Sequence, residues 1–131
     1  MKQVLSVGQM KHLQEIGLEL RNSSMLLWYK QMLGKISISD WELSVWRESL
    51  FSEDHVYPAY TLQDILDKLP CFIGKEVLTM QKLADSYTCL YMESYTRSMI
   101  KITESKELID AAYDMLCWCI ENGYVKVEKE E

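Results

Sequence analysis

The sequence predicts a single α+β domain in which about three helices pack on a small antiparallel sheet of three to five strands. Apolar residues recur at helical spacing near 7–16, 62–69 and 106–121, and the segments between them carry strand and turn signals. The predicted order is α-β-β-α-β-β-α. At 131 residues, 48% of them hydrophobic, the chain has the size and apolar content of one domain with its own core.

The first two helices begin with the same signal. Ser6 is followed three residues later by Gln9, and Thr61 by Asp64, which is the spacing of a capping box. Asp64 and Lys68 are expected to form an exposed i,i+4 pair. Apolar residues flank both boxes at the spacing of a hydrophobic staple: Leu5 with Met10, and Tyr60 with Ile65.

The first helix also has a stop signal. Gly17 suits the left-handed position after a helix, where Leu18 folds back on Leu13 in a Schellman ending. Pro70 ends the second helix because a proline cannot continue a helix.

The remaining segments predict strands. Residues 25–32 and 35–39 flank Gly34 as a hairpin, and 41–45 fits either a strand or a capped helix, of which we prefer the strand. Two further strands, at 77–83 and 86–94, form a hairpin, and 98–102 adds a short strand.

The last helix, predicted to be capped by Ser105 and to end at Asn122-Gly123, is apolar on two sides. One side carries Ile109, Ala112, Tyr113, Leu116 and Ile120. The opposite side carries Ala111, Met115 and Trp118. A helix of this kind is either enclosed within its domain or covered by a partner. Ala111, Met115 and Trp118 are therefore the candidate interface of a homodimer or of a contact with another protein.

The Cys-Trp-Cys triplet in that helix does not predict a metal or redox site. Cys117 and Cys119 point about 160° apart on a helix, so one ion cannot reach both. Neither the other cysteines nor the two histidines complete a zinc-site spacing, and no phosphate-binding glycine loop is present. We expect buried free thiols, no metal and no cofactor.

Charge excludes other classes of function. The chain has 20 acidic and 14 basic residues, a formal charge of −6, which disfavours binding to nucleic acid or anionic membranes.

No apolar run approaches a membrane span, and the first residues lack a signal-peptide pattern, so we expect a cytoplasmic protein. Residues 127–131 are expected to form a frayed acidic tail.

Two alternatives stay open. The cluster Ser52-Glu53-Asp54-His55 could serve a small hydrolase or ligand-binding domain centred near His55, although no nucleophile elbow accompanies it. A further alternative is a DNA-associated protein, or an acidic domain that occupies the basic groove of a host protein as a DNA mimic. We expect neither enzymatic activity nor direct nucleic-acid binding.

Several segments together resemble a group of known sequences. MKHLQEIGLEL, LLWYK, YPAYTLQDILDKLP and ELIDAAYDMLCWCIENGYV, in this order, are similar to small uncharacterised proteins encoded by phages, prophages and mobile elements of gut bacteria. The resemblance implies an α+β fold and a mobile-element setting, and it brings no activity and no catalytic residues. With the aromatic face of the last helix, it predicts a non-enzymatic protein-interaction module.

Overall fold

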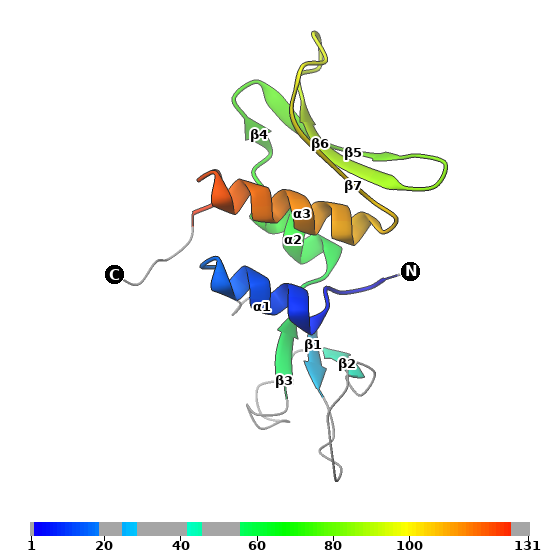
Figure 1. The fold of residues 1–131 in the computed structure, drawn as a ribbon, viewed down its shortest axis with the longest axis vertical. Coiled ribbons are helices and arrows are strands. Elements are labelled where there is room, and N and C mark those ends of the chain that lie inside the picture. The colour runs from blue at the N-terminus through cyan, green and yellow to red at the C-terminus, as the bar shows by residue number, and fades with distance from the viewer. Residues whose placement is uncertain (1, 19–24, 29–41, 46–55, 127–131) are drawn as a thin grey trace.

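The computed structural model describes residues 2–18, 25–28, 42–45 and 56–126, and these form an α+β fold with three helices and two antiparallel sheets (Figure 1). One sheet, in the order β2-β1-β3, consists of β1 (Met25–Trp28), β2 (Glu42–Val45) and β3 (Val56–Ala59). The other, in the order β4-β5-β6-β7, consists of β4 (Phe72–Ile73), β5 (Glu76–Lys82), β6 (Tyr87–Met92) and β7 (Met99–Ser105).

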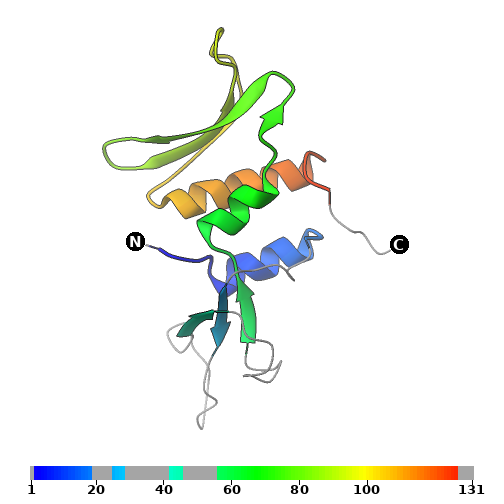
Figure 2. The ribbon, with the colours of Figure 1, turned by 180° about the vertical axis from the view of Figure 1, so that it is seen from behind.

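The helices α1 (Val7–Glu15), α2 (Leu62–Lys68) and α3 (Leu108–Glu121) lie between the two sheets (Figures 1 and 2). The α+β class is therefore confirmed, but the described strands form two sheets where one was expected. None of the described helices has the length and apolar character needed to cross a membrane.

Both predicted capping boxes are present. The Ser6 hydroxyl accepts a hydrogen bond from the backbone N–H of Gln9 (3.1 Å), and the Gln9 side chain accepts one from the N–H of Ser6 (2.9 Å). Thr61 and Asp64 make the same two bonds at the start of α2, at 3.2 and 2.9 Å. Asp64 is buried, so its expected exposed position is wrong.

The two helix entries are joined to each other. The N–H of Leu5 donates to the carbonyl of Tyr60 (2.9 Å), and Val4 pairs with Thr61 in an antiparallel bridge. The staple residues Leu5, Met10, Tyr60 and Ile65 are all fully buried. Residues far apart in the sequence therefore position α1 against α2 at their N-termini.

The end of α1 is the predicted Schellman motif. The N–H of Gly17 donates to the carbonyl of Gln14 (3.1 Å), and that of Leu18 to Leu13 (3.0 Å). Gly17 has a φ of 104°, in the left-handed region that favours glycine.

The end of α3 has the same geometry. Gly123, with a φ of 79°, donates to the carbonyl of Ile120 (3.2 Å), and Tyr124 donates to Cys119 (2.8 Å). The chain then turns back along the helix, and Val125 is buried in the core.

The start of α3 differs from the prediction. Ser105 is the last residue of β7, and Glu107 is the N-cap residue, without a side-chain capping bond. Ser105 instead accepts a hydrogen bond from the N–H of Glu107 (3.4 Å). The helix therefore begins at Leu108, two residues later than predicted, because β7 continues pairing with β6 through Ser105.

The strand predictions hold where the structure describes them. β5 and β6 form the expected hairpin, β7 pairs with β6, and residues 42–45 are a strand, β2, paired with β1. β3 and β4 were not predicted. The proposed strand at 35–39, the turn at Gly34 and His55 lie outside the described residues.

Gly123, which has a positive φ, and Gly8, which lies inside α1, give a testable contrast. Gly123→Ala is expected to lower the free energy of unfolding by about 1 kcal/mol, because its Cβ meets nothing within 4 Å and the cost comes only from the positive φ. Gly8→Ala, in α1, places a Cβ at an ordinary 3.8 Å from the Ser6 hydroxyl. It is expected to raise stability by about 0.5 kcal/mol. Urea unfolding of both variants checks the signs, and a shared sign would contradict this account.

Candidate functional site

The third helix is enclosed within the chain. α3 packs against β6 and β7 on one side and against α2 on the other (Figure 1). Ala111 and Met115 are fully buried in the core cluster, so they have no surface to offer a partner. Of the two interpretations of a helix that is apolar on both sides, the intramolecular one therefore applies to these two residues.

Trp118 has a different environment. It is partly buried against the core, and its ring centroid lies 5.3 Å from that of Tyr124, with the rings tilted by 31°. The Schellman ending of α3 brings Tyr124 back to this position. Tyr124 therefore covers part of the Trp118 ring, and the candidate interface of Ala111, Met115 and Trp118 does not form one exposed surface.

The cysteines lie in separate environments. Cys119 is buried beside the Tyr91 hydroxyl, whereas Cys117 is partly buried beside that of Tyr113. Burial raises the pKa of Cys117 and Cys119 to about 11 and that of Cys89 to about 12. At neutral pH these three side chains are thiols, which are poor nucleophiles and poor metal ligands. In the described part of the chain, no group of three or more His, Cys, Asp or Glu residues is placed to hold a metal ion.

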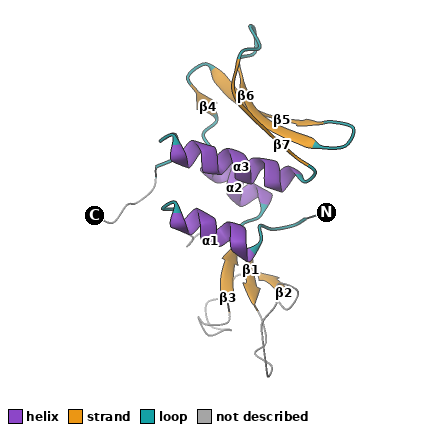
Figure 3. Cartoon of the chain, viewed as in Figure 1, coloured by secondary structure: helices purple, strands orange, loops and turns teal. Residues whose placement is uncertain are grey.

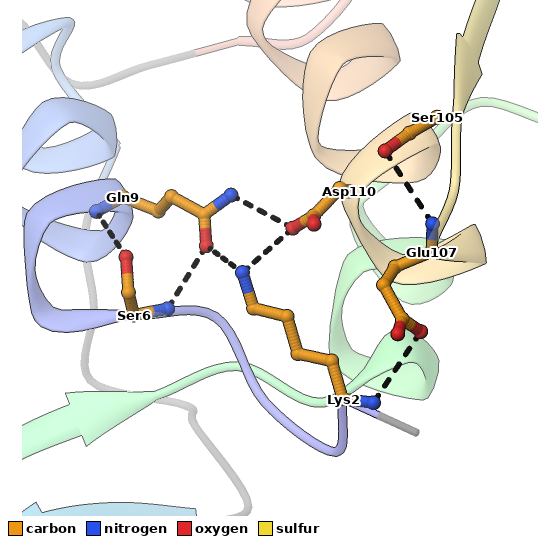
Figure 4. Close-up of polar contacts among 6 residues, drawn as sticks. All are labelled: Lys2, Ser6, Gln9, Ser105, Glu107 and Asp110. Carbon is orange, nitrogen blue, oxygen red and sulfur yellow. Dashed lines mark hydrogen bonds and ion pairs between the residues drawn. The ribbon is translucent and has the colours of Figure 1, made fainter.

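A polar cluster joins the N-terminal segment to the starts of α1 and α3 (Figure 4). The Lys2 ammonium donates to Gln9 Oε1 and to Asp110 Oδ1, both at 2.7 Å. The amide nitrogen of Gln9 donates to the same Asp110 oxygen (2.9 Å), and the backbone N–H of Lys2 donates to Glu107 Oε2 (3.3 Å).

Gln9 has two functions in this cluster. Its carbonyl oxygen completes the capping box with Ser6, while its amide nitrogen contacts Asp110. Burial alone would raise the pKa of Asp110, but hydrogen bonds from Gln9 and Lys2 and the Lys2 charge together lower it below the ordinary value. Because these groups bind one another, the cluster connects the two helices and presents no activated acid or base.

A shallow pocket of about 300 Å³ lies beside this cluster, between the N-terminal segment and the starts of α2 and α3. Its described lining contains no His, Cys or Ser, and the Glu107 carboxylate at its edge accepts the bond from Lys2. The Thr61 hydroxyl in this lining accepts the capping bond from the Asp64 N–H, and no described His or Cys lines the pocket beside it to act as a base.

The four-stranded sheet carries the described helices on one face only (Figure 3). Cys89 and Tyr91 of β6 belong to the core cluster formed with α3. Successive side chains of a strand point to opposite faces. Thr88, Leu90 and Met92 therefore point away from the helices, toward a surface that we call the outer face.

Strand register arranges the outer face in three rows that run across the sheet. One row is apolar, the middle row is mostly apolar, and the last row is polar. The members of the three rows are, in turn, Phe72, Val77, Met92 and Met99; Thr79, Leu90 and Ile102; and Gln81, Thr88 and Glu104.

The outer face has exposed apolar margins around a buried centre. Phe72 and Met99 are exposed, and Ile102 is 48% exposed. Leu90 and Thr88, on the central strand β6, are only 1% and 3% exposed. Met99 and Ile102 lie on the β7 margin and Phe72 on the β4 margin, with the partly buried Val77 and Met92 between them. Exposed apolar residues that belong to one face of a sheet are typical of a surface that contacts another molecule.

Thr88 adds a polar feature to this centre. Its hydroxyl oxygen is buried and has no hydrogen-bond partner among the described residues. Leaving a buried hydroxyl without a partner costs about 1–3 kcal/mol. Because the hydroxyl is covered by the chain's own atoms, a molecule that docks on the outer face does not reach it.

The segment that forms the four-stranded sheet is electrically neutral as a whole. Residues 72–105 contain four basic residues (Lys75, Lys82, Arg97, Lys101) and four acidic ones (Glu76, Asp85, Glu93, Glu104), whereas the whole chain has a net charge of −6. The only charged residue in the three rows is Glu104. This composition disfavours binding of nucleic acid and suits a protein partner whose contact surface is mainly apolar.

The outer face is not evident from the sequence pattern. The segment YTCLYM of β6 is apolar on both faces, so its pattern does not show which side meets the helices. The neighbouring strands do carry a signal for this surface, because Phe72 and Ile102 are apolar and fall on the same face once the strands are paired. Comparisons with protein-family models, curated proteins and solved structures gave no match.

The burial of the thiols predicts their reactivity. Of the 4 cysteines, only Cys71 is exposed. We expect it to react rapidly with a thiol reagent such as DTNB at pH 8, and the other three to react slowly until the protein is unfolded in urea. Mass spectrometry of the labelled peptides identifies each site. Rapid labelling of Cys89 or Cys119 in the folded protein would contradict the burial described.

The polar cluster predicts an unusual effect at a capping position. Glu normally serves as well as Gln in a capping box, but Gln9→Glu would place a second carboxylate against Asp110. We expect a loss of about 1 kcal/mol in the free energy of unfolding at pH 7, since the donor to Asp110 is lost and two like charges meet.

The control is Gln63→Glu, because Gln63 donates to Asp67 at 2.8 Å in an exposed pair. Its effect should stay within about 0.5 kcal/mol. The folded-state pKa of Asp110 is lowered, so the cluster stabilises the fold above the ordinary Asp pKa and loses this contribution as the pH falls through the folded-state value. The Gln9→Glu penalty should therefore shrink toward about pH 3. Urea unfolding at both pH values tests it, and equal effects of the two substitutions would refute the assignment.

Proposed function

We propose that this protein is a non-enzymatic protein-interaction module whose docking surface is the outer face of the four-stranded sheet. The observation that carries the proposal is the set of exposed apolar side chains on this face, which are those of Phe72, Met99 and Ile102. Such side chains favour coverage by the apolar surface of another protein.

The proposal replaces the contact surface expected from the sequence. Ala111 and Met115 are enclosed by the protein's own sheet and helices, so an interaction must use other residues. Ile102, Met99 and Phe72 provide the exposed apolar area. A module of this kind fits the mobile-element setting that the sequence resemblance implies, and that setting rests on the resemblance alone.

Other functions receive less support from the described residues. A nucleic-acid contact would be expected to use a basic surface, and the outer face has none. The hydrolase interpretation depends on His55, which lies outside the described residues, and the pocket near Lys2 lacks a catalytic pair. The outer face, which is mainly apolar and has Glu104 as the single charged residue of its three rows, therefore favours a protein partner.

Site-specific photo-crosslinking tests the proposal. A benzoylphenylalanine residue at position 102 should form cross-linked adducts in cells, because Ile102 lies on the docking surface. The matched control is position 124, where Tyr124 is 44% exposed, close to the 48% of Ile102, but follows α3 on the helix side of the sheet. We expect adducts from position 102 at several times the yield from position 124. Equal yields, or none at position 102, would refute the docking surface.

A further inference from the structure

The strand order of the four-stranded sheet makes its outer face self-complementary. β6 is flanked by β5 and β7, and both run antiparallel to it. β5 and β7 therefore run in the same direction, with Gln81 and Glu104 level with Thr88. A two-fold axis parallel to β6 keeps every residue at its own height along the strands and exchanges the β5 side for the β7 side.

From this geometry we infer that the molecule that covers the outer face is a second copy of this chain, packed face to face about a two-fold axis that runs along β6. The inference rests on the proposed function and adds the identity of the partner. The result is a two-layer sandwich in which β6 lies over β6 of the second copy and β5 lies over its β7. Aligned packing of this kind tolerates a rotation of about 30° between sheets.

The polar row matches itself under this operation. The Gln81 amide comes to lie opposite Glu104 of the second copy, so an N–H donor faces a carboxylate acceptor. Glu104 already accepts a hydrogen bond from Ser86 through Oε1 (2.6 Å), which leaves its second oxygen for this contact. The two-fold axis produces this Gln81–Glu104 contact twice. The two Glu104 carboxylates then lie on opposite sides of the axis and do not face each other.

The apolar rows match themselves under the same operation. Thr79 comes to lie opposite Ile102 of the second copy, and Val77 opposite its Met99, on either side of β6. Leu90 and Thr88 on β6 are already buried within their own chain, so these flanking pairs form the contact. Every row therefore meets a row of the same character.

An alternative dimer would extend the sheet through the edge strand β7. Lys101 argues against this arrangement. It pairs with Tyr91 in the register and therefore lies on the helix side of β7, in the middle of the edge. A charged residue at this position is a device that protects a sheet edge from pairing with another strand.

The size of the surface sets the expected affinity. About ten residues form the three rows, fewer than the roughly 20–30 residues per partner of a standard interface. We therefore expect a reversible dimer with a dissociation constant on the order of 1–100 μM.

Sedimentation equilibrium of the full chain, from about 1 to 200 μM, measures this association. Ile102→Glu should weaken it at least tenfold, because a charge would replace an apolar contact, whereas Tyr124→Glu, on the helix side of the sheet, should leave it unchanged. Circular dichroism verifies that each variant is folded. If Ile102→Glu fails to fold, the exposed Gln81 provides the second test.

That second test addresses the register itself. Gln81→Glu should weaken the dimer about tenfold, because it faces Glu104 of the second copy with a like charge. Adding Glu104→Gln in the same chain exchanges the two groups and should restore association. In the monomer, β6 separates these residues, so the rescue reports on the contact between copies.

The sedimentation and cross-linking results together test the position of the interface, the identity of the partner and the interaction function. Concentration-dependent dimers with this mutational pattern support the face-to-face arrangement. Dimers that respond to neither Ile102→Glu nor Gln81→Glu overturn the placement of the interface. A chain that is monomeric at 200 μM but whose position 102 cross-links to a different protein overturns the second copy and leaves the interaction function standing. A monomer without adducts at position 102 overturns both.

Discussion

The fold depends on the burial of α3 on two sides. A helix that is apolar around most of its circumference needs two layers to cover it, and here the four-stranded sheet supplies one and α2 the other. Ala111 and Met115 are buried for this reason, and Thr103 strengthens the arrangement by donating to the carbonyl of Ala111 (2.7 Å). Because one face of the sheet is occupied by the helix, only the opposite face is open to another molecule.

A second constraint couples the ends of the helices. Gln9 closes the capping box of α1 and at the same time contacts Asp110 in the first turn of α3, while Lys2 connects both. Local helix initiation and long-range packing therefore use the same side chain. The backbone hydrogen bond between Leu5 and Tyr60 joins the segments that lead into α1 and α2, so all three helices are connected at their N-terminal ends.

The features that could be predicted from the sequence are those encoded within a few residues. The capping boxes, the Schellman ending at Gly17 and the hairpin of β5 and β6 belong to this group. The cap at Ser105 was wrong because pairing of β7 with β6 outweighed the local helix signal. The candidate surface could not be predicted because YTCLYM is buried on both faces, and only the paired strands show that Leu90 and Cys89 face different layers.

The distribution of charge has a consequence for how the protein behaves at high concentration. The segment 72–105 is neutral, so the net charge of −6 belongs entirely to the rest of the chain. In Figure 1 the four-stranded sheet forms one end of the molecule. Two molecules can approach through that end with little electrostatic opposition, whereas an approach through the rest of the chain meets its excess negative charge. Association through the neutral end should therefore give complexes of defined size and not open-ended assemblies.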